Sequence, residues 1–592
     1  MLCLTTLKRG PPTSVSSCPA LPLPTSASMS PPALTLSSNF PAVVAESAHA
    51  GLILTGIGLF TFIVVYQLVL YPFYFSPLRT LPGPPLGPNF LIGRFGDILN
   101  GEAGIPQREW VKKYGKRIRV VGPIGIERVI FSGTEALQRI LNTNWISNPR
   151  PTFVREILGF VTGYGLLTVT GYRHKQMRKA MNPAFSIPNL AAQTDMYYKP
   201  ICGLLAILDR RVKETQDGSS VEVMSKWMNK VTLDIICLTG FGYETDSLHN
   251  PHNELAEAYE ELLLLQTGPT VSRFIAIFSI PGISTLLLSE FAWRHHNVLA
   301  KLPLLAPIAT LLDAMHRIKA VSASILREKL KEAEYLENNE DRTAKKDIMS
   351  LLVRARRADQ KAKGPKGGVS ESVPYAMSDS EMMDQVLTFL GAGHDTTASG
   401  LVWTLWLLAK NPMCQQKLRE EIIPHTTMSD TDDLRKIGLG YRELKDLVWL
   451  DCVVQESLRL YPPVPMTFRQ AATTDYVDGV LVPKGTLYYI PIRVVNTLKD
   501  IWGEDAEEFN PSRWLSEKCT GSTPLTLTFL AGPHACIAKT MAIMEMKAVI
   551  AALVANFEFS PSYEGQEAIP TAAITMKPAD GMPLKVRKVE VR

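Results

Sequence analysis

The longest uninterrupted apolar run of the chain lies near its N-terminus. Residues 51–71 (GLILTGIGLFTFIVVYQLVLY) contain no charged side chain in 21 positions. At about 1.5 Å of rise per residue, a helix of this length spans about 31 Å, close to the hydrocarbon thickness of a bilayer. The run also lacks a polar face. It therefore predicts a single transmembrane helix over 51–71, with a buried core helix as the alternative.

The segments on either side of this run have a different composition. Residues 1–41 hold eight prolines, eight serines and only two charges, and such a stretch buries too little apolar surface to offset its ordering entropy. We therefore predict a disordered extension over 1–50; a dispensable leader before a start at Met29 is the alternative. Residues 72–88 contain Leu-Pro-Gly-Pro-Pro, and because proline fixes φ they are predicted to form a stiff linker.

The remaining residues, 89–592, show mostly helical periodicity, and we predict one mainly α domain with small β-sheets. Ser378 and Glu381 form the pattern of a capping box, which begins a helix that continues to the Asn-Pro pair at 411–412. This helix would be about 48 Å long, enough to cross a whole domain. Short strand-like segments lie at 117–121, 128–131 and 487–492.

Composition and charge narrow the class of protein. The net charge is only +5 in 592 residues, which does not favour a nucleic-acid binder. Eight cysteines in a chain of this length do not make a disulfide scaffold, and no two are spaced as CxxC, which disfavours a structural zinc site. With 46% apolar residues the chain can build a large core.

One cysteine lies in a segment with chemical potential. Residues 529–538 (FLAGPHACIA, the cysteine loop) precede an apolar-periodic helix that continues through Ala555. Cys536 would thus lie at a helix N-terminus, where the dipole and free N–H groups stabilise a thiolate. Gly532 would allow close approach of the backbone to a flat cofactor. The alternative is a buried cysteine that acts as a small hydrophobic residue.

Two further segments supply a candidate ion-pair network. Glu456 and Arg459 are spaced i, i+3, so both side chains lie on one helix face. Arg513, in the sequence FNPSRW at 509–514, supplies a second guanidinium. Together the three predict a buried bidentate lock that holds the cysteine loop; an ordinary surface ion pair is the alternative.

The long helix contains an unusual stretch, GAGHDTT at 391–397. Two glycines and two threonines weaken a helix interior, and such local rule-breaking suggests a functional site. A kink here would open a groove, and Asp395 and Thr396 would supply an acid and a hydroxyl for proton delivery. A simple packing accommodation is the alternative.

In this order and spacing, the four segments resemble the cytochrome P450 family of haem-thiolate monooxygenases, of a fungal microsomal type, over residues 80–590. The resemblance implies the cytochrome P450 fold and haem b as cofactor, with Cys536 as the axial thiolate ligand of the iron. It also implies that Phe529 packs against the cysteine loop, and that Asp395 and Thr396 are the proton-relay pair beside bound O₂.

The chain departs from the family pattern near the haem propionates. His534 stands where the family usually has arginine, and Ala538 where it has glycine. His174 replaces the tryptophan of the family's WxxxR helix, whose arginine is Arg178, and Arg469 matches a further propionate-binding arginine. Because neutral histidine binds a carboxylate less firmly than arginine does, Arg178 and Arg469 are expected to carry most of this charge.

The resemblance also implies partners. No flavin or nicotinamide site is evident, so electrons are expected from NADPH through a separate NADPH–cytochrome P450 reductase. Candidate docking charges on the helix of His174 are Arg173, Lys175 and Lys179, with a solvated helix face as the alternative. Basic residues follow the anchor in excess, which favours a cytoplasmic catalytic domain. These residues are Arg79, Arg94, Arg108, Lys112 and Lys113. The resemblance to microsomal enzymes implies the membrane of the endoplasmic reticulum.

Substrate contacts follow only from family geometry. The candidates are apolar, which favours a hydrophobic, membrane-partitioned substrate, although each could instead be simple core. They are Phe389, Ala392, Val464, Met466 and Ile574, with residues 262–277 as a lid and the apolar stretch 158–161 nearby.

The leading hypothesis is oxygen insertion in secondary metabolite biosynthesis, and a xenobiotic-oxidising P450 is the runner-up. A haem-thiolate isomerase or dehydratase that needs no O₂ is a second enzyme class, against which the pair Asp395 and Thr396 argues. The non-enzyme alternatives are a haem-binding receptor or reductase chaperone, and a membrane-tethered helical protein without cofactor.

Overall fold

The computed structural model describes residues 40–87, 93–338, 346–363, 375, 377–428, 434–516, 526–571 and 574–589. Contacts divide the chain into two units, residues 1–64 and 65–592. In the first unit the described residues form most of helix α1 (Phe40–Val65). The predicted disorder of residues 1–39 lies outside the described residues.

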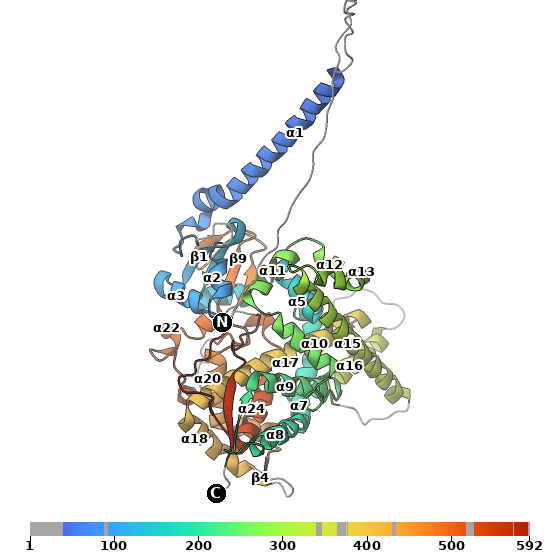
Figure 1. Cartoon of the computed structure of the whole chain (residues 1–592), viewed down its shortest axis with the longest axis vertical. Coiled ribbons are helices and arrows are strands. Elements are labelled where there is room, and N and C mark those ends of the chain that lie inside the picture. Colours follow the sequence, from blue (N-terminus) through green and yellow to red (C-terminus); the bar gives the residue numbers. More distant parts are fainter. Residues whose placement is uncertain are drawn as a thin grey trace, which may run out of the picture. The chain divides into compact units, whose positions relative to one another are not determined.

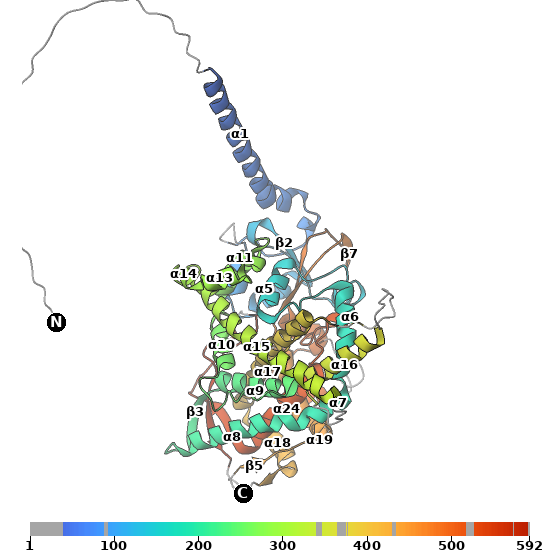
Figure 2. The same cartoon turned by 90° about the vertical axis from the view of Figure 1, so that its right-hand side faces the viewer.

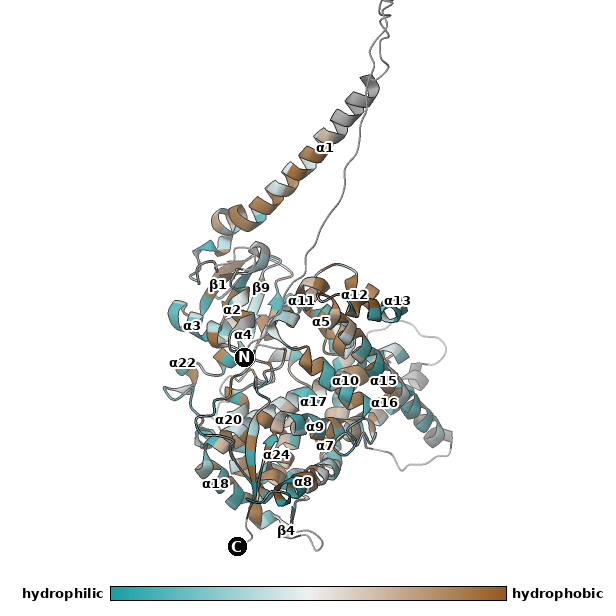
Figure 3. Cartoon of the chain, in the orientation of Figure 1, coloured by the Kyte–Doolittle hydropathy of each residue, from teal (hydrophilic) through white to brown (hydrophobic). Residues whose placement is uncertain are grey.

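Helix α1 begins at Phe40, well before the anchor predicted at 51. Residues 40–50 are therefore helical, and the prediction of a disordered extension is wrong for them. The physical reason is that Pro41 lies in the first turn, where its missing N–H costs nothing, and that alanines dominate the next turns. Figure 3 shows the apolar colouring along α1.

The helical path continues through η1 (Tyr66–Phe75), whose turns are π-type and which contains Pro72. In the described part of the chain, Ala50–Phe75 is the one helical stretch long and apolar enough to cross a membrane, by length and composition. Its side chains from Leu52 to Phe62 are exposed.

The second unit is mainly helical, as predicted. Its longer helices are α3 (Ile105–Tyr114), α5 (Thr152–Thr162), α6 (Gly171–Met181), α8 (Tyr198–Lys213), α9 (Met224–Phe241), α10 (Glu254–Leu264), α11 (Gly268–Phe278), α15 (Ala306–Asn338), α16 (Ile348–Lys363), α17 (Asp379–Lys410), α18 (Pro412–Ile422), α20 (Val448–Leu460) and α24 (Lys539–Asn556). Shorter ones are α2 (Phe95–Asn100), α4 (Thr134–Gln138), α7 (Ile187–Gln193), α12 (Ile283–Leu287), α13 (Glu290–Arg294), α14 (His296–Ala300), α19 (Tyr441–Asp446), α21 (Ile492–Val495) and α22 (Lys499–Trp502).

The sheets are small. The largest has the order β1 (Arg117–Val121), β2 (Glu127–Phe131), β9 (Leu487–Ile490), β6 (Thr467–Gln470), and a second has the order β10 (Phe557–Pro561), β11 (Pro583–Lys588), β3 (Ser219–Val223). Two pairs complete the set: β4 (Thr427–Met428) with β5 (Arg435–Lys436), and β7 (Asp475–Val477) with β8 (Val480–Val482). The three predicted strands are confirmed; the last ends at Ile490 because Pro491 cannot donate to the ladder.

Helix α17 runs through the middle of the second unit and separates two hydrophobic cores (Figures 1 and 2). Its first half, with Phe389 and Leu390, packs in the core built with α5, α9, α10 and α15. Its second half, from Leu401 to Leu408, packs in the core built with α8, α18, α20 and α24. The predicted capping box is confirmed, since Ser378 caps the helix and Glu381 returns the bond. This central helix positions residues 391–397 inside the unit.

Helix α17 is not interrupted at the predicted kink, since its helical turns continue over 391–397. The two glycines serve close packing instead. A Cβ at Gly393 would lie 2.8 Å from Cγ1 of Ile236 on α9, and one at Gly391 would lie 3.1 Å from Cγ2 of Thr162 on α5. Larger residues would push both neighbouring helices away.

Candidate active site

The cysteine loop folds back on itself before α24 begins. The amide of Cys536 donates to the carbonyl of Phe529 (2.8 Å), and a 3₁₀ turn (η9, Gly532–His534) lies between them. Gly532 has φ +69°, and a Cβ there would collide with the backbone of Leu141. The glycine is thus required by a protein contact, whereas the sequence suggested approach to a cofactor.

The thiol of Cys536 combines two properties. Its side chain is solvent-exposed, yet burial by the surrounding protein is the main cause that raises the pKa of this thiol, against the lowering effects of the Ala538 amide, Arg178 and Lys539. The Cys536 side chain is therefore accessible to solvent although protein atoms surround it closely. A bound metal cation would deprotonate such a thiol outright.

The middle of α17 also borders open space. Residues 391–393 and Thr396 are partly exposed, whereas the helix is mostly buried before and after them. The hydroxyl of Thr396 donates to the carbonyl of Ala392 one turn earlier (2.9 Å). Because Thr396 is partly exposed, its hydroxyl can exchange this backbone bond for a bond to a ligand.

The neighbouring acid has other partners. Lys577 Nζ lies 2.5 Å from Asp395 Oδ1, and the hydroxyl of Thr575 donates to Oδ2 (2.7 Å). Burial raises the pKa of Asp395, but Lys577 and His394 lower it more, so the net pKa is below its usual value. The side chains of Asp395 and Thr396 therefore have different partners. The sequence analysis named neither Lys577 nor Thr575 as a site residue.

Five cationic or titratable side chains gather beside the cysteine loop. They are Arg150, Arg178, Arg469, His174 and His534. The two imidazole rings lie 4.0 Å apart between centroids. Burial and the neighbouring arginines lower the pKa of His174 to about 4, and burial, Arg150 and His174 lower that of His534 to about 2. Both histidines are therefore neutral at pH 7.

No carboxylate balances the three arginines of this cluster within the part of the chain that the structure describes. Arg150 Nη1 donates to the carbonyl of Leu167 (2.7 Å), Arg178 Nη1 donates to the carbonyl of Ala535, and Arg469 Nη1 donates to the carbonyl of Phe468 (2.7 Å). Within the described residues, Arg469 Nη2 and His174 Nδ1 are buried without any partner. Buried cations are costly without an anion, so the cluster is incomplete by itself.

The predicted lock forms as one buried network. Glu456 and Arg459 are fully buried and share two hydrogen bonds of 2.8 Å each. Arg513 Nε donates to Glu456 Oε1 (2.9 Å), as does the Asn510 amide (3.0 Å), and the Trp514 indole donates to Oε2 (3.0 Å). The carboxylate of Glu456 thus accepts five hydrogen bonds.

Asn496 connects this lock to the segment before the cysteine loop. Its carbonyl accepts from Arg459 Nη1 (3.0 Å), while its side chain accepts from the Leu527 amide (2.8 Å) and donates to the hydroxyl of Thr528 (2.9 Å). The sequence assigned no role to Asn496. Only the tertiary contacts show that Asn496 joins the lock to the residues directly before the cysteine loop.

Comparison with known proteins decides the family. The family model for cytochrome P450 matches residues 82–584. The chain belongs to the cytochrome P450 family. It is 32% identical over 526 residues to cytochrome P450 monooxygenase 205 of Postia placenta, covering 85% of this chain and 90% of that protein. It is also 29% identical to cytochrome P450 monooxygenase sphH of Aspergillus fumigatus, covering 92% and 94% of the two chains.

This P450 is therefore a monooxygenase, and the family implies haem held by a cysteine thiolate, O₂, an organic substrate and a redox partner. The described residues fit haem well. The thiol of Cys536 is exposed, and among the described residues no carboxylate pairs with the cluster around Arg469, where two propionates would supply the anions. Trp145 lies edge-on to both His174 and His534, at 5.9 and 5.4 Å between ring centroids. The sequence missed both Arg150 and Trp145.

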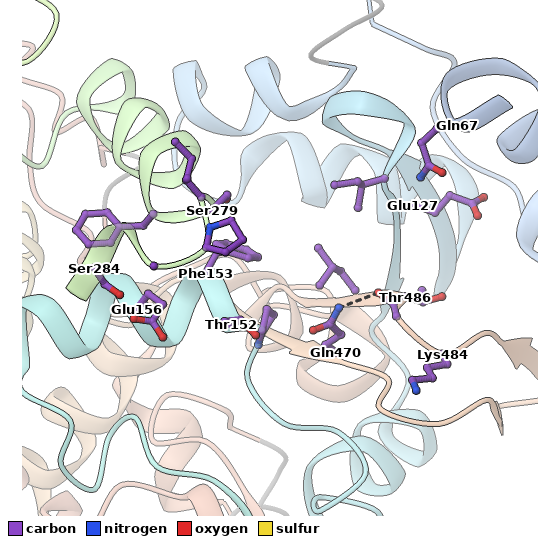
Figure 4. A pocket seen from close by; sticks show the side chains of 18 of the residues that line it. Gln67, Glu127, Thr152, Phe153, Glu156, Ser279, Ser284, Gln470, Lys484 and Thr486 are labelled. Atoms are coloured by element: carbon purple, nitrogen blue, oxygen red, sulfur yellow. Dashed lines mark hydrogen bonds between the residues drawn. The ribbon is translucent and has the colours of Figure 1, made fainter. Parts of the chain in front are cut away.

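A large cavity of this P450 lies away from the predicted substrate contacts. It has a volume of about 1190 Å³ and is bounded by η1, α5 and residues 278–288. Figure 4 shows Glu156 and Ser284 on one side and Gln67 and Glu127 on the other. The predicted lid at 262–277 comprises the end of α10 and nearly all of α11. The wall of the cavity includes the segment that directly follows this lid. None of the five predicted substrate contacts lines it.

The predicted substrate contacts and docking charges have different environments. Phe389 is buried, Ala392, Val464 and Met466 are partly buried, and Ile574 is exposed. On α6, Arg173, Lys175 and Lys179 are all exposed. Arg173 also donates to Glu381 (2.8 Å), so part of this charge is already paired.

Proposed function

We propose that Cys536 is the axial ligand of haem b and that this P450 inserts one oxygen atom of O₂ into a C–H or C=C bond of a hydrophobic substrate. The observation that carries the proposal is the cluster of Arg150, Arg178 and Arg469 beside the cysteine loop, which no carboxylate among the described residues balances. Haem, when bound, supplies the iron at which O₂ is reduced. For a C–H bond the balance is RH + O₂ + NADPH + H⁺ giving ROH + H₂O + NADP⁺.

The residues around the haem have separate tasks. Arg178 and Arg469, with Arg150, hold the propionates, because a guanidinium binds a carboxylate in a bidentate way. His174 and His534 stay neutral and contribute single hydrogen bonds there. Phe529 covers the thiolate loop, and the lock of Glu456, Arg459 and Arg513 keeps the loop in place.

The same proposal gives Thr396 and Asp395 the delivery of protons. The hydroxyl of Thr396 would pass a proton toward the reacting oxygen, and the Asp395 carboxylate would accept a proton from solvent and pass it on to Thr396. The partial exposure of Thr396 and the ionised state of Asp395 support these roles. This intact pair favours an oxygen-inserting enzyme over an isomerase or dehydratase.

Electrons come from NADPH through a membrane-bound NADPH–cytochrome P450 reductase. The exposed cations Arg173, Lys175 and Lys179 on α6 support docking of an acidic partner, because charge complementarity steers such encounters. Arg178 lies on the same helix and contacts the cysteine loop. A partner on the outer face of α6 would thus be close to the metal ligand.

We further propose a single-pass protein of the endoplasmic reticulum with a cytoplasmic catalytic domain. Residues 51–71 form the anchor, 72–88 the linker, 89–592 the monooxygenase domain, and residues 1–50 an extension before the anchor. The apolar span Ala50–Phe75 supports the anchor. A hydrophobic substrate dissolved in that membrane, in fungal secondary metabolism, agrees with the fungal relatives.

The experiment is a carbon monoxide difference spectrum of the dithionite-reduced full-length protein. Wild type is expected to show the red-shifted Soret band of a thiolate-bound haem, and Cys536→Ser is expected to lose it. Cys202→Ser, at an exposed cysteine on α8, is the matched control and keeps the band. A wild type without this band, or a Cys536→Ser variant that retains it, contradicts the proposal.

A further inference from the structure

Asp395 is bound to a loop that lies almost two hundred residues away in sequence. Lys577 approaches one carboxylate oxygen and Thr575 donates to the other, so both oxygens of this buried side chain have a partner from the same loop. Thr575 also donates to Gln266 Oε1, just after α10 (3.2 Å). The acid of the proposed relay is thus fixed by residues outside α17.

This loop, residues 574–580, is attached to α17 at neighbouring points. The carbonyl of Met576 accepts from the hydroxyl of Ser399 (2.7 Å) and from the indole of Trp403 (2.9 Å). The Met576 amide donates to the carbonyl of Pro463 (2.7 Å), next to the predicted substrate contact Val464. The loop therefore lies against the central helix at Asp395 and again one to two turns further along.

The same loop reaches open space. Ile574, directly before Thr575, is 39% exposed, although Thr575 and Met576 are buried. A group bound against Ile574 would push on a segment whose next three residues hold the acid and the helix. Ile574 is therefore one residue from Thr575, which holds the carboxylate of Asp395.

We propose that Lys577 and Thr575 are positioning residues, which orient the Asp395 carboxylate for proton delivery and couple it to substrate contact at Ile574. This inference rests on the proposed monooxygenase function. The groups that act on Asp395 are Lys577 and Thr575 from the loop and His394 from its own helix. Lys577 is the largest of the causes that lower the pKa of Asp395 and lies in ion-pair contact with it, so Lys577 is the main cation that keeps the acid ionised.

The test compares Lys577→Met with wild type in the reductase-coupled holoenzyme. Without its cation, the buried carboxylate loses both orientation and charge stabilisation. The share of NADPH electrons that reaches product is expected to fall by about tenfold, with the rest appearing as H₂O₂ from O₂ + NADPH + H⁺. The pH of half-maximal coupling is expected to rise by about one unit, while KM and the carbon monoxide spectrum stay unchanged.

Controls separate a positioning role from a merely structural one. Lys577→Arg keeps the cation and is expected to retain most of the coupling. Lys585 lies on β11 and pairs with exposed Asp217, so Lys585→Met is expected to leave coupling unchanged. In an Asp395→Asn background, Lys577→Met is expected to have no further effect, because residues that act through one another are not additive.

The overturning outcomes are distinct from failure of the proposed function. Additive effects of Lys577→Met and Asp395→Asn, or an unchanged pH profile in Lys577→Met, refute the inference while the thiolate spectrum still stands. If Lys577→Met does not fold, Thr575→Val serves instead, and faster amide hydrogen exchange across residues 574–580 is the expected second readout. Unchanged exchange and coupling in Thr575→Val also refute it.

Discussion

Glu456 is the residue on which the scaffold of the site depends most. Its carboxylate is fully buried and accepts five hydrogen bonds, two of them from Arg459. A buried charge of this kind is stable only while its partners remain, because desolvation is no longer offset once one is removed. The cost of changing Arg459 therefore exceeds that of an ordinary ion pair.

We predict that Arg459→Ala destabilises the protein by about 3–5 kcal/mol and that the purified variant carries little haem. The physical reason is the unpaired Glu456 and the loss of the bond to Asn496, which supports the segment before the cysteine loop. Urea unfolding and the haem-to-protein absorbance ratio measure both effects. Full haem occupancy in this variant contradicts the role of the lock. Arg459→Lys cannot form the bidentate pair, so its stability and haem content should lie between those of wild type and Arg459→Ala.

At the scale of elements, the start of α17 gives a pH-dependent prediction. Burial raises the pKa of Glu381, but hydrogen bonds from Tyr375, Ser378 and Arg173 lower it to about 2. A depressed folded-state pKa contributes stability above the unfolded value and loses it as pH falls from about 4.5 toward 2. Glu381 therefore stabilises the helix at neutral pH.

Glu381→Gln is expected to lower the free energy of unfolding by about 1 kcal/mol at pH 7. The difference from wild type should shrink as pH falls below about 4, where the wild-type carboxyl begins to lose its charge in the unfolded state. Chemical unfolding at pH 7 and pH 3.5 measures this. A difference that is equal at both pH values contradicts the assigned ion pairing.

The elements also show what sequence can and cannot predict. Helix α17 follows from Ser378 and Glu381 at one end and the Asn-Pro pair at the other, because caps and stops are local. The lock follows from i, i+3 spacing. The roles of Lys577 and Arg150 could not be predicted from the sequence, because only the tertiary fold brings these residues to their partners. The sequence alone does not separate the two interpretations of Gly391 and Gly393, because weak helix propensity at a functional site and close helix packing leave the same pattern.

At the scale of the whole molecule, the boundary between the two units lies inside the apolar helical span. Residues after Val64 belong to the second unit. There, Arg119 Nη2 donates to the carbonyl of Pro72, and Ser76 donates to Glu127 Oε2 (2.6 Å). Leu78 is completely buried. The second half of the span is therefore part of the folded body.

We predict that removal of residues 1–64 releases the protein from membranes and preserves the carbon monoxide spectrum. Removal of residues 1–80 should lower stability by several kcal/mol, because it exposes the site of Leu78 and leaves Glu127 and Arg119 without these partners. Membrane fractionation and thermal unfolding of the two truncations provide the comparison. Equal stability would contradict the assignment of η1 to the body.

The cluster of buried arginines has a consequence for the life of the protein in a cell. Before the cofactor binds, the buried guanidinium groups of Arg150 and Arg469 repel each other. This repulsion lowers the free energy of unfolding of the newly made chain. Ligand binding to the native state alone offsets that loss by mass action. We therefore expect haem binding to stabilise the folded chain, and the amount of folded protein in a cell to rise with haem supply.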